Sequence, residues 1–303
     1  MLKSLLMVWI MTFDLGHTEQ AYQDFFGYTL GERDIITHEL ALQMSRPDLS
    51  GARYTTLYPP SGPRVGLRFI EGPQTDYYPM RHLGWNAIEI LVADPKTLKV
   101  KLDSSPFKRL AGPDFLTPAQ NILALQALGP SNELLYLTHI IDPTTSFLVI
   151  PHTPTPVGQT FIMVLGTPDL SASMTFFEHH FVNPVKGPLP FKVEVLSNAY
   201  QLPIDHLHDL GLVTFSDGFA LELDQYPSTA LPLPAEPNLS GGVVMVTASY
   251  DPSTIKVPLQ WQSTSEASGS HTQTQTGIIK LPSGALMQLI PESSPLAASN
   301  ILN

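Results

Sequence analysis

The chain has 303 residues, which is enough to bury a large core and to form two domains. Its net charge is −11 and its 16 Lys and Arg residues are scattered, which argues against nucleic-acid binding, because phosphate backbones require clustered cations. The absence of cysteine excludes disulfides, thiolate catalysis and Cys-ligated metal sites, and it fits a reducing cytoplasm.

The first predicted element is a buried strand at the N-terminus. The run MLKSLLMVWIMTF has one lysine followed by apolar residues, as a signal peptide does, but Asp14 ends it and no small-residue cleavage site follows. No run in the chain reaches the ~18 apolar residues that would span a bilayer. We therefore expect a cytoplasmic protein without a membrane-embedded part.

Apolar runs that close on an aspartate occur four times along the chain. They are MVWIMTFDL, AIEILVADP, IMVLGTPDL and VVMVTASYDP, and their aspartates are Asp14, Asp94, Asp169 and Asp251. Each run predicts a strand whose aspartate begins a loop or caps the next element. Aromatic residues at helical spacing follow the first and third runs, and Gly27 is a plausible end for the first helix.

Each of these four units also ends in the same way. PSGPRVGLRFIE, GPSNELLYLTHI, FSDGFALELDQY and LPSGALMQLIPE are all turns of Ser, Gly or Asn that lead into an apolar strand. A tight turn before a final strand is typical of a hairpin. Each unit is therefore predicted to be a strand, a helix and about three further strands.

The connector between the second and third units sets the predicted domain boundaries. IDPTTSFLVIPHTPTPVG is rich in Pro and Thr, which is typical of a link between folded parts. We predict an N-terminal domain at 1–142 from the first two units, a linker at 143–157, and a C-terminal domain at 158–303 from the last two.

The repeated units resemble the vicinal oxygen chelate superfamily, which includes glyoxalase I, bleomycin-resistance proteins and type I extradiol dioxygenases. The resemblance is carried by VLGTPDLSASMTFFEHHF, FDLGHTEQAYQDFFGYTLGER, GWNAIEILVADP and ALELDQYP, and it covers essentially the whole chain. It implies an α+β fold in which four βαβββ modules pair into two glyoxalase-like domains with cupped mixed sheets. It also implies a small-molecule site in one cleft, usually with a divalent metal.

Most of the metal ligands that this family uses are missing from the matching positions. The family places a His or another ligand on the first strand, where this sequence has Met7, Ala87, Ile162 and Val244. It places a Glu on the last strand, where this sequence has Arg68, Tyr136, Glu222 and Gln288. Only Glu222 is a good ligand. We therefore predict no cofactor, and keep a site for iron, manganese or zinc that includes Glu222 as the alternative.

Polar residues in the first half suggest chemistry that needs no metal. Arg68 is a fixed cation that could pair with Glu89 or bind an anionic substrate. Tyr136 could donate a hydrogen bond to a carbonyl or enolate oxygen, and Glu89 could act as a base if burial raises its pKa. Trp85 and Asn86 are predicted to contact substrate. A buried Arg–Glu–Tyr network without a catalytic role is the alternative.

In the second half the corresponding residues are Glu222, Asp224 and Gln288. Glu222 and Asp224 share one face of a strand, and like charges at that spacing raise the pKa of one carboxyl group. The alternative is a solvated face at the rim of the sheet, which explains Asp224 better than Glu222.

These observations favour a small-molecule enzyme with lyase or isomerase chemistry by proton transfer, from which the standard metal ligands have been lost. The alternatives are a metal-dependent extradiol-type dioxygenase with shifted ligands and a non-catalytic binding protein of the resistance type. The predicted catalytic residues are Glu222, Arg68, Tyr136 and Glu89, and the predicted substrate-binding residues are Trp85, Asn86, Gln288 and Asp224. We expect a small-molecule substrate, no nucleic-acid or membrane partner, and strand edges compatible with a homodimer.

Overall fold

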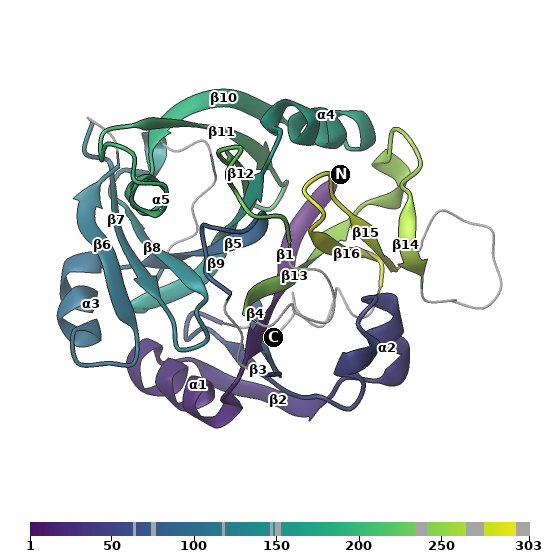
Figure 1. Cartoon of the computed structure of the whole chain (residues 1–303), viewed down its shortest axis with the longest axis horizontal. Helices are drawn as coiled ribbons and strands as arrows, with labels where there is room; N and C mark the ends of the chain where they lie inside the picture. Colours follow the sequence, from purple (N-terminus) through teal and green to yellow (C-terminus); the bar gives the residue numbers. More distant parts are fainter. Residues whose placement is uncertain are drawn as a thin grey trace.

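The computed structural model describes residues 1–62, 65–73, 77–116, 119–145, 148, 153–233, 241–264 and 276–294. Within these residues the chain repeats one βαβββ module four times (Figure 1). The first module contains β1 (Leu2–Thr12), α1 (Leu15–Ala21), a π-helical turn (Tyr22–Phe26), β2 (Thr29–Ile35), α2 (His38–Gln43), a 3-10 turn (Pro47–Leu49), β3 (Arg53–Tyr58) and β4 (Gly66–Glu71). The second contains β5 (Gly84–Val92), α3 (Pro95–Leu102), β6 (Lys108–Phe115), β7 (Ile122–Leu128) and β8 (Leu134–Ile140).

The third and fourth modules follow a short 3-10 turn, Pro143–Thr145. The third contains β9 (Val157–Thr167), α4 (Leu170–His180), β10 (Val185–Lys192), α5 (Glu194–Ala199), β11 (Leu207–Thr214) and β12 (Ala220–Gln225). The fourth contains β13 (Gly242–Tyr250), a 3-10 turn (Pro252–Thr254), β14 (Trp261–Thr264), β15 (Gly277–Lys280) and β16 (Leu286–Pro291). The predicted strand, helix and three strands are confirmed, except that the fourth module has a single 3-10 turn in place of the helix.

The four aspartates at the ends of the first strands act as the predicted caps. The side chains of Asp14, Asp94 and Asp169 accept hydrogen bonds from the first-turn backbone N–H groups of α1, α3 and α4. Asp251 accepts from Ser253 N at the 3-10 turn. Gly27 ends the helical segment of the first module with a φ of 73°, a left-handed conformation that favours glycine.

The strands form two sheets of eight, and each sheet combines two modules. One sheet has the order β14-β15-β16-β13-β1-β4-β3-β2, which joins the fourth module to the first. The other has the order β10-β11-β12-β9-β5-β8-β7-β6, which joins the third module to the second. In both, two first strands lie antiparallel at the centre: β1 beside β13, and β5 beside β9 (Figure 1). The predicted pairing into cupped mixed sheets is confirmed.

The partners within each pair differ from those of the sequence analysis, which grouped the modules in chain order as 1–142 and 158–303. The sheets instead join the outer two modules and the inner two modules. The four first strands are nearly continuous buried runs, so each could pair with any other. Local sequence pattern therefore defines the modules but not their partners.

Alternating residues of the central strands face two different environments. Val8 and Ile10 of β1 and Ile88 and Ile90 of β5 belong to one apolar core that both sheets share. The residues that alternate with these along each strand point away from the shared core, into the hollow of their own sheet, where any site would lie. No helix among the described residues is long and apolar enough to cross a membrane.

The predicted linker, 143–157, lies partly outside the described residues, at 146, 147 and 149–152. Its described part begins with the 3-10 turn and ends where β9 starts at Val157. Leu148, in the middle of the linker, is buried. The connector therefore contributes at least one side chain to the interior of the protein.

Candidate functional site

Each sheet is curved (Figure 1), and a second set of side chains lines the hollow on its face away from the shared core. We call the hollow of the β5–β12 sheet, built from the second and third modules, the open cup. We call the hollow of the β1–β16 sheet, built from the first and fourth modules, the filled cup. The two differ in what occupies them.

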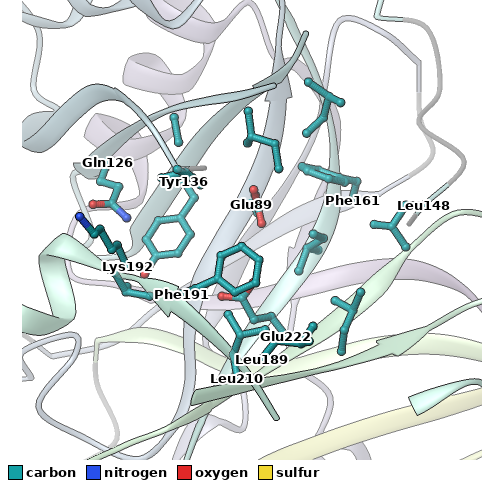
Figure 2. Close-up of a pocket in the computed structure, with 17 residues that line it drawn as sticks. Glu89, Gln126, Tyr136, Leu148, Phe161, Leu189, Phe191, Lys192, Leu210 and Glu222 are labelled. Atoms are coloured by element: carbon teal, nitrogen blue, oxygen red, sulfur yellow. The ribbon is translucent and has the colours of Figure 1, made fainter. Parts of the chain in front are cut away.

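The open cup contains a cavity of about 140 Å³ (Figure 2). Strands of both modules and the connector residue Leu148 form its walls. The lining residues are Glu89, Leu116, Ile122, Ala124, Gln126, Tyr136, Ile140, Leu148, Phe161, Ile162, Leu189, Phe191, Lys192, Val193, Leu210, Leu212 and Glu222.

Strand register explains why the polar side chains meet in this cavity. Tyr136 of β8 lies beside Gln126 of β7 on one side and beside Glu89 of β5 on the other. Glu89 is in turn paired with Ile162 of β9. Side chains in register across a sheet share a face, so this row points into one hollow. Glu222 projects from β12 on the far side of β9, and Figure 2 shows its carboxyl group near that of Glu89.

Glu89 is 7% exposed, and its immediate surroundings keep its carboxyl group in the neutral form. Burial, followed by the nearby Glu222 carboxyl group, raises the pKa of Glu89 from 4.5 to about 8. The Thr138 hydroxyl donates a 2.6 Å hydrogen bond to one Glu89 oxygen, which opposes this rise. Glu89 can therefore carry a proton at neutral pH.

Glu222 and Asp224 form a closely interacting pair on β12. Burial and the adjacent Asp224 raise the pKa of Glu222 well above its usual range, and burial raises the pKa of Asp224 to about 7. Neither Asp224 oxygen has a conventional donor within reach. Both carboxyl groups therefore favour the protonated form, and because they interact closely they titrate as a pair. Asp224 has no exposed surface, which rules out the solvated rim that its sequence context suggested.

Tyr136 presents a hydroxyl group without a partner to this cluster. Its side chain is buried and lines the cavity, and its oxygen has no hydrogen-bond partner among the described residues. Burial, with Asp224, Glu222 and Glu89 nearby, raises the pKa of the Tyr136 hydroxyl well above its usual range. The group is therefore a neutral donor, and an unpaired buried donor is costly unless a ligand satisfies it.

Arg68 lies in the filled cup, not beside Glu89 and Tyr136 as the sequence analysis proposed. Its guanidinium group stacks between the rings of Trp9 and Tyr54, at 4.6 and 4.3 Å from the ring centroids. It donates to the Thr56 hydroxyl at 2.9 Å and pairs with Glu32. The separation follows from the module pairing, since β4 and β8 belong to different sheets.

Gln288 is also in the filled cup, away from Glu222 and Asp224. Its side-chain oxygen accepts from the Thr247 hydroxyl at 2.8 Å, and Thr247 accepts from the Trp9 indole N–H at 2.8 Å. Buried apolar side chains pack around these groups, including Met7 and Met245. The filled cup therefore satisfies its own polar groups.

Trp85 and Asn86, the predicted substrate contacts, do not line the cavity. Trp85 belongs to the core between the sheets, and its indole N–H donates to the Leu286 carbonyl at 2.8 Å. The Asn86 amide accepts from Met80 N and donates to two backbone carbonyls. Asn86 therefore fixes the backbone that leads into β5, and Trp85 links β5 to β16 of the other sheet.

The sequence analysis missed several residues that the cavity brings together, chiefly Gln126, Phe161, Phe191 and Lys192. Gln126 and the β10 residues belong to middle strands of their modules, whose positions the sequence pattern resolves poorly. Leu189 and Phe191 alternate along β10 and are a weak signal of a strand with one face inward.

The residues of the open cup do not fit the divalent metal that the fold implies. The two last-strand positions hold Tyr136 and Glu222, and the first-strand positions hold Ala87 and Ile162, which have no donor atoms. Among the described residues, no group of three or more His, Cys, Asp or Glu side chains is placed to hold a metal ion. We derive no step through a metal.

Comparison with solved structures finds the same fold along the whole chain. Glyoxalase I from Zea mays matches with a TM-score of 0.61 and 15% identity, covering 98% of this chain and 95% of that chain. A point mutant of that enzyme matches with a TM-score of 0.61 and 16% identity, covering 99% of this chain and 95% of that chain. A candidate dioxygenase from Bacillus subtilis subsp. subtilis str. 168 matches with a TM-score of 0.59 and 9% identity, covering 98% of this chain and 88% of that chain.

No protein-family model matches the sequence, and no curated protein matches it either. At these identities the solved structures establish the fold alone. The chain has the vicinal oxygen chelate fold in its four-module form, which confirms the resemblance inferred from the repeats.

Proposed function

We propose that this chain, with its vicinal oxygen chelate fold, is a small-molecule enzyme that moves a proton on a substrate held in the open cup. The reaction class is isomerase or lyase. One observation carries the proposal: a single apolar cavity holds two carboxyl groups with raised pKa values and a tyrosine hydroxyl that lacks a partner among the described residues. Perturbed acids that converge in a cavity are typical of proton-transfer sites.

The Glu222–Asp224 pair is the proposed base. Because its carboxyl groups titrate together, the pair can take a proton through Glu222, which lines the cavity, while Asp224 lies behind it. The pKa of Asp224, about 7, places the titration of the pair near neutral pH. A base is most effective when its pKa lies close to the working pH.

Glu89 and Tyr136 are the proposed acid and oxyanion donor. Glu89 remains protonated at neutral pH and has one oxygen free of the Thr138 hydrogen bond. The Tyr136 hydroxyl can donate to a carbonyl oxygen as that oxygen gains negative charge. The proton removed from carbon returns to another carbon or to the other face of the same carbon, so the step needs no oxidant.

A non-catalytic binding protein is the second candidate function, supported by the apolar character of the cavity. Five of its 17 lining residues are polar, and the other twelve are apolar. The five are Glu89, Gln126, Tyr136, Lys192 and Glu222. Predominantly apolar walls with a few polar groups suit binding alone as well as catalysis.

Deuterium exchange separates these two candidates. Single-ring ketones and aldehydes are incubated with the protein in D₂O, and loss of the C–H signal next to the carbonyl group is followed by proton NMR. We expect exchange by the wild type and a roughly 10²–10⁴-fold slower rate in Glu222→Gln. The matched control is Glu71→Gln, since Glu71 pairs with Arg53 at the end of β4 in the other sheet. Binding without exchange supports the second candidate, and equal rates in Glu222→Gln and wild type contradict the site.

A further inference from the structure

The open cup is large enough for one ring. Its cavity of about 140 Å³ is close to an engineered apolar protein cavity of ~150 Å³ that binds benzene. Phe161 and Phe191 line the cavity and offer aromatic surface to a ring.

A single cation stands among the residues that line this cavity. Lys192, at the end of β10, is exposed at the cavity wall (Figure 2). Within the described part of the chain it has no ion-pair or hydrogen-bond partner. A surface lysine without a partner is common, but this one borders an apolar cavity, where a charge interaction is less screened than in bulk water.

Gln126 adds a second polar group on the same side. Its side chain is 7% exposed and lines the cavity, yet it makes no hydrogen bond to any residue that the structure describes. Its carboxamide can donate two hydrogen bonds and accept others. This amide faces the cavity without a protein partner, so a ligand group in the cavity can bond to it.

These two residues lie apart from the acid–base groups. Figure 2 shows Lys192 and Gln126 on one side of the Tyr136 ring and Glu89 and Glu222 on the other. The strand order β7, β8, β5 gives the same sequence of Gln126, Tyr136 and Glu89 across the sheet. A ligand anion beside Lys192 therefore lies on the opposite side of Tyr136 from the carboxyl groups.

We infer that the open cup takes a single-ring substrate that carries a carboxylate, and that Lys192 and Gln126 bind this carboxylate. The ring occupies the apolar walls, and the reacting end of the molecule points to Glu89 and Glu222. This inference rests on the proposed function only for the role of that reacting end. Ammonium and carboxamide groups that converge on one anion give a charge-assisted pair of hydrogen bonds.

The test compares phenylacetate with phenylacetamide, which have the same ring and nearly the same shape but differ in charge. Affinities are measured at pH 6.5 by NMR titration for wild type, Lys192→Gln, Lys192→Arg and Gln126→Leu. We expect the wild type to prefer phenylacetate by roughly tenfold, Lys192→Gln to lose that preference, and Lys192→Arg to keep it. Gln126→Leu should weaken phenylacetate binding several-fold. Lys186→Gln, on the same strand but outside the cavity, is the matched control.

Equal affinity of the wild type for the two compounds, a preference that survives in Lys192→Gln, or binding of neither compound would overturn the inference. The result is independent of the deuterium-exchange experiment. A carboxylate preference that depends on Lys192, without proton exchange on any carbonyl compound, supports this inference while the proposed function fails. If exchange depends on Glu222 but the carboxylate preference is absent, the proposed function is supported and this inference fails.

Discussion

The open and filled cups are built on the same repeat but use equivalent positions differently. The last-strand position holds Tyr136 and Glu222 in the open cup, and Arg68 and Gln288 in the filled cup. In the filled cup both of these last-strand residues have a protein partner, whereas the Tyr136 hydroxyl has none among the described residues. This difference is the basis for proposing chemistry in the open cup and a stabilising role for the polar groups of the filled cup.

The largest expected effect is on the deuterium-exchange rate of Tyr136→Phe, a variant in the open cup. We expect the deuterium-exchange rate to fall by roughly 10²–10³-fold, because the substrate oxygen loses its donor. The free energy of unfolding should stay within ~0.5 kcal/mol of wild type or rise, since the removed hydroxyl has no partner to lose. Exchange kinetics and urea unfolding measure the two quantities on the same preparation.

The matched variant in the filled cup is Gln288→Leu, which should show the opposite behaviour. The Thr247 hydroxyl loses its acceptor, and the Trp9–Thr247 interaction becomes less well oriented, so we expect a stability loss of about 1–2 kcal/mol and an unchanged exchange rate. If Tyr136→Phe destabilises the protein and leaves exchange intact, the open cup is structural as well.

The second prediction removes the cation that holds the filled cup together. Arg68→Ala should lower the free energy of unfolding by about 2–3 kcal/mol, because Arg68 packs against two rings and donates to Thr56. Arg53→Ala is the control on the same sheet: its ion pair with Glu71 is exposed, and such pairs contribute about 0–1 kcal/mol. Similar losses in the two variants, measured by urea unfolding, would show that the stacked position has no special role.

The third prediction concerns pH and the neutral carboxyl group of Glu89. The folded-state pKa of Glu89, about 8, lies above its unfolded value of 4.5, so the folded state binds more protons between these values. Glu89 therefore contributes stability that is fully present below pH 4.5 and is lost as the pH rises to 8, at up to about 1.4 kcal/mol per pH unit. Burial lowers the pKa of His208 from 6.5 to about 4, so the folded state binds fewer protons than the unfolded state between these values. His208 therefore makes the free energy of unfolding rise with pH in that range, which is opposite to the effect of Glu89.

Urea unfolding at pH 6.5 and 8 tests this assignment by comparing Glu89→Gln with wild type, because the other groups that titrate in this window, such as Asp224 and Glu133 with pKa values of about 7, are present in both proteins. The stability of Glu89→Gln relative to wild type should increase by about 1–2 kcal/mol between pH 6.5 and pH 8. Arg68→Ala should retain the wild-type pH dependence, because its effect lies in the other cup. If Glu89→Gln has the same pH dependence as wild type, Glu89 is ionised in the folded protein at both pH values and the assignment is wrong.

The fold could be predicted because each module carries its own local signals. Asp94 and Asp169 close apolar strands and cap helices, and Gly218 and Gly284, with φ of 87° and 89°, form the turns before β12 and β16. These signals act over a few residues, so a single sequence displays them. The module partners depend on contacts between strands far apart in the chain, and β1 gives no sign of preferring β13.

Three of the predicted residues line the cavity. Glu89 and Glu222 stand out in the sequence because a charged residue interrupts an apolar strand, and Tyr136 stands out by its position on the last strand of its module. Asp224 was misjudged because Gln225 and Tyr226 follow it and suggest a strand end, whereas Tyr226 is 1% exposed and the strand end is covered. Lys192 is an ordinary lysine in the sequence, and only the curvature of the sheet brings it to the cavity.

The smallest expected effect concerns one hydrogen bond between the first and second modules. The Tyr22 hydroxyl, from the first module, donates a 2.8 Å hydrogen bond to the buried Glu133 at the start of β8 in the second. Tyr22→Phe removes this bond, while Ser131 N still donates to the other Glu133 oxygen at 2.8 Å. We expect a loss of about 1 kcal/mol in the free energy of unfolding.

Tyr28→Phe is the matched control, since Tyr28 is a buried neighbour whose hydroxyl has no partner among the described residues. It should change the free energy of unfolding by less than ~0.5 kcal/mol, and neither variant should change the exchange rate. Equal losses in both would mean that ring packing and not the hydrogen bond joins the modules. A fall in the exchange rate of Tyr22→Phe alone would show that the open cup depends on its link to the first module, so that the two cups could no longer be treated as independent.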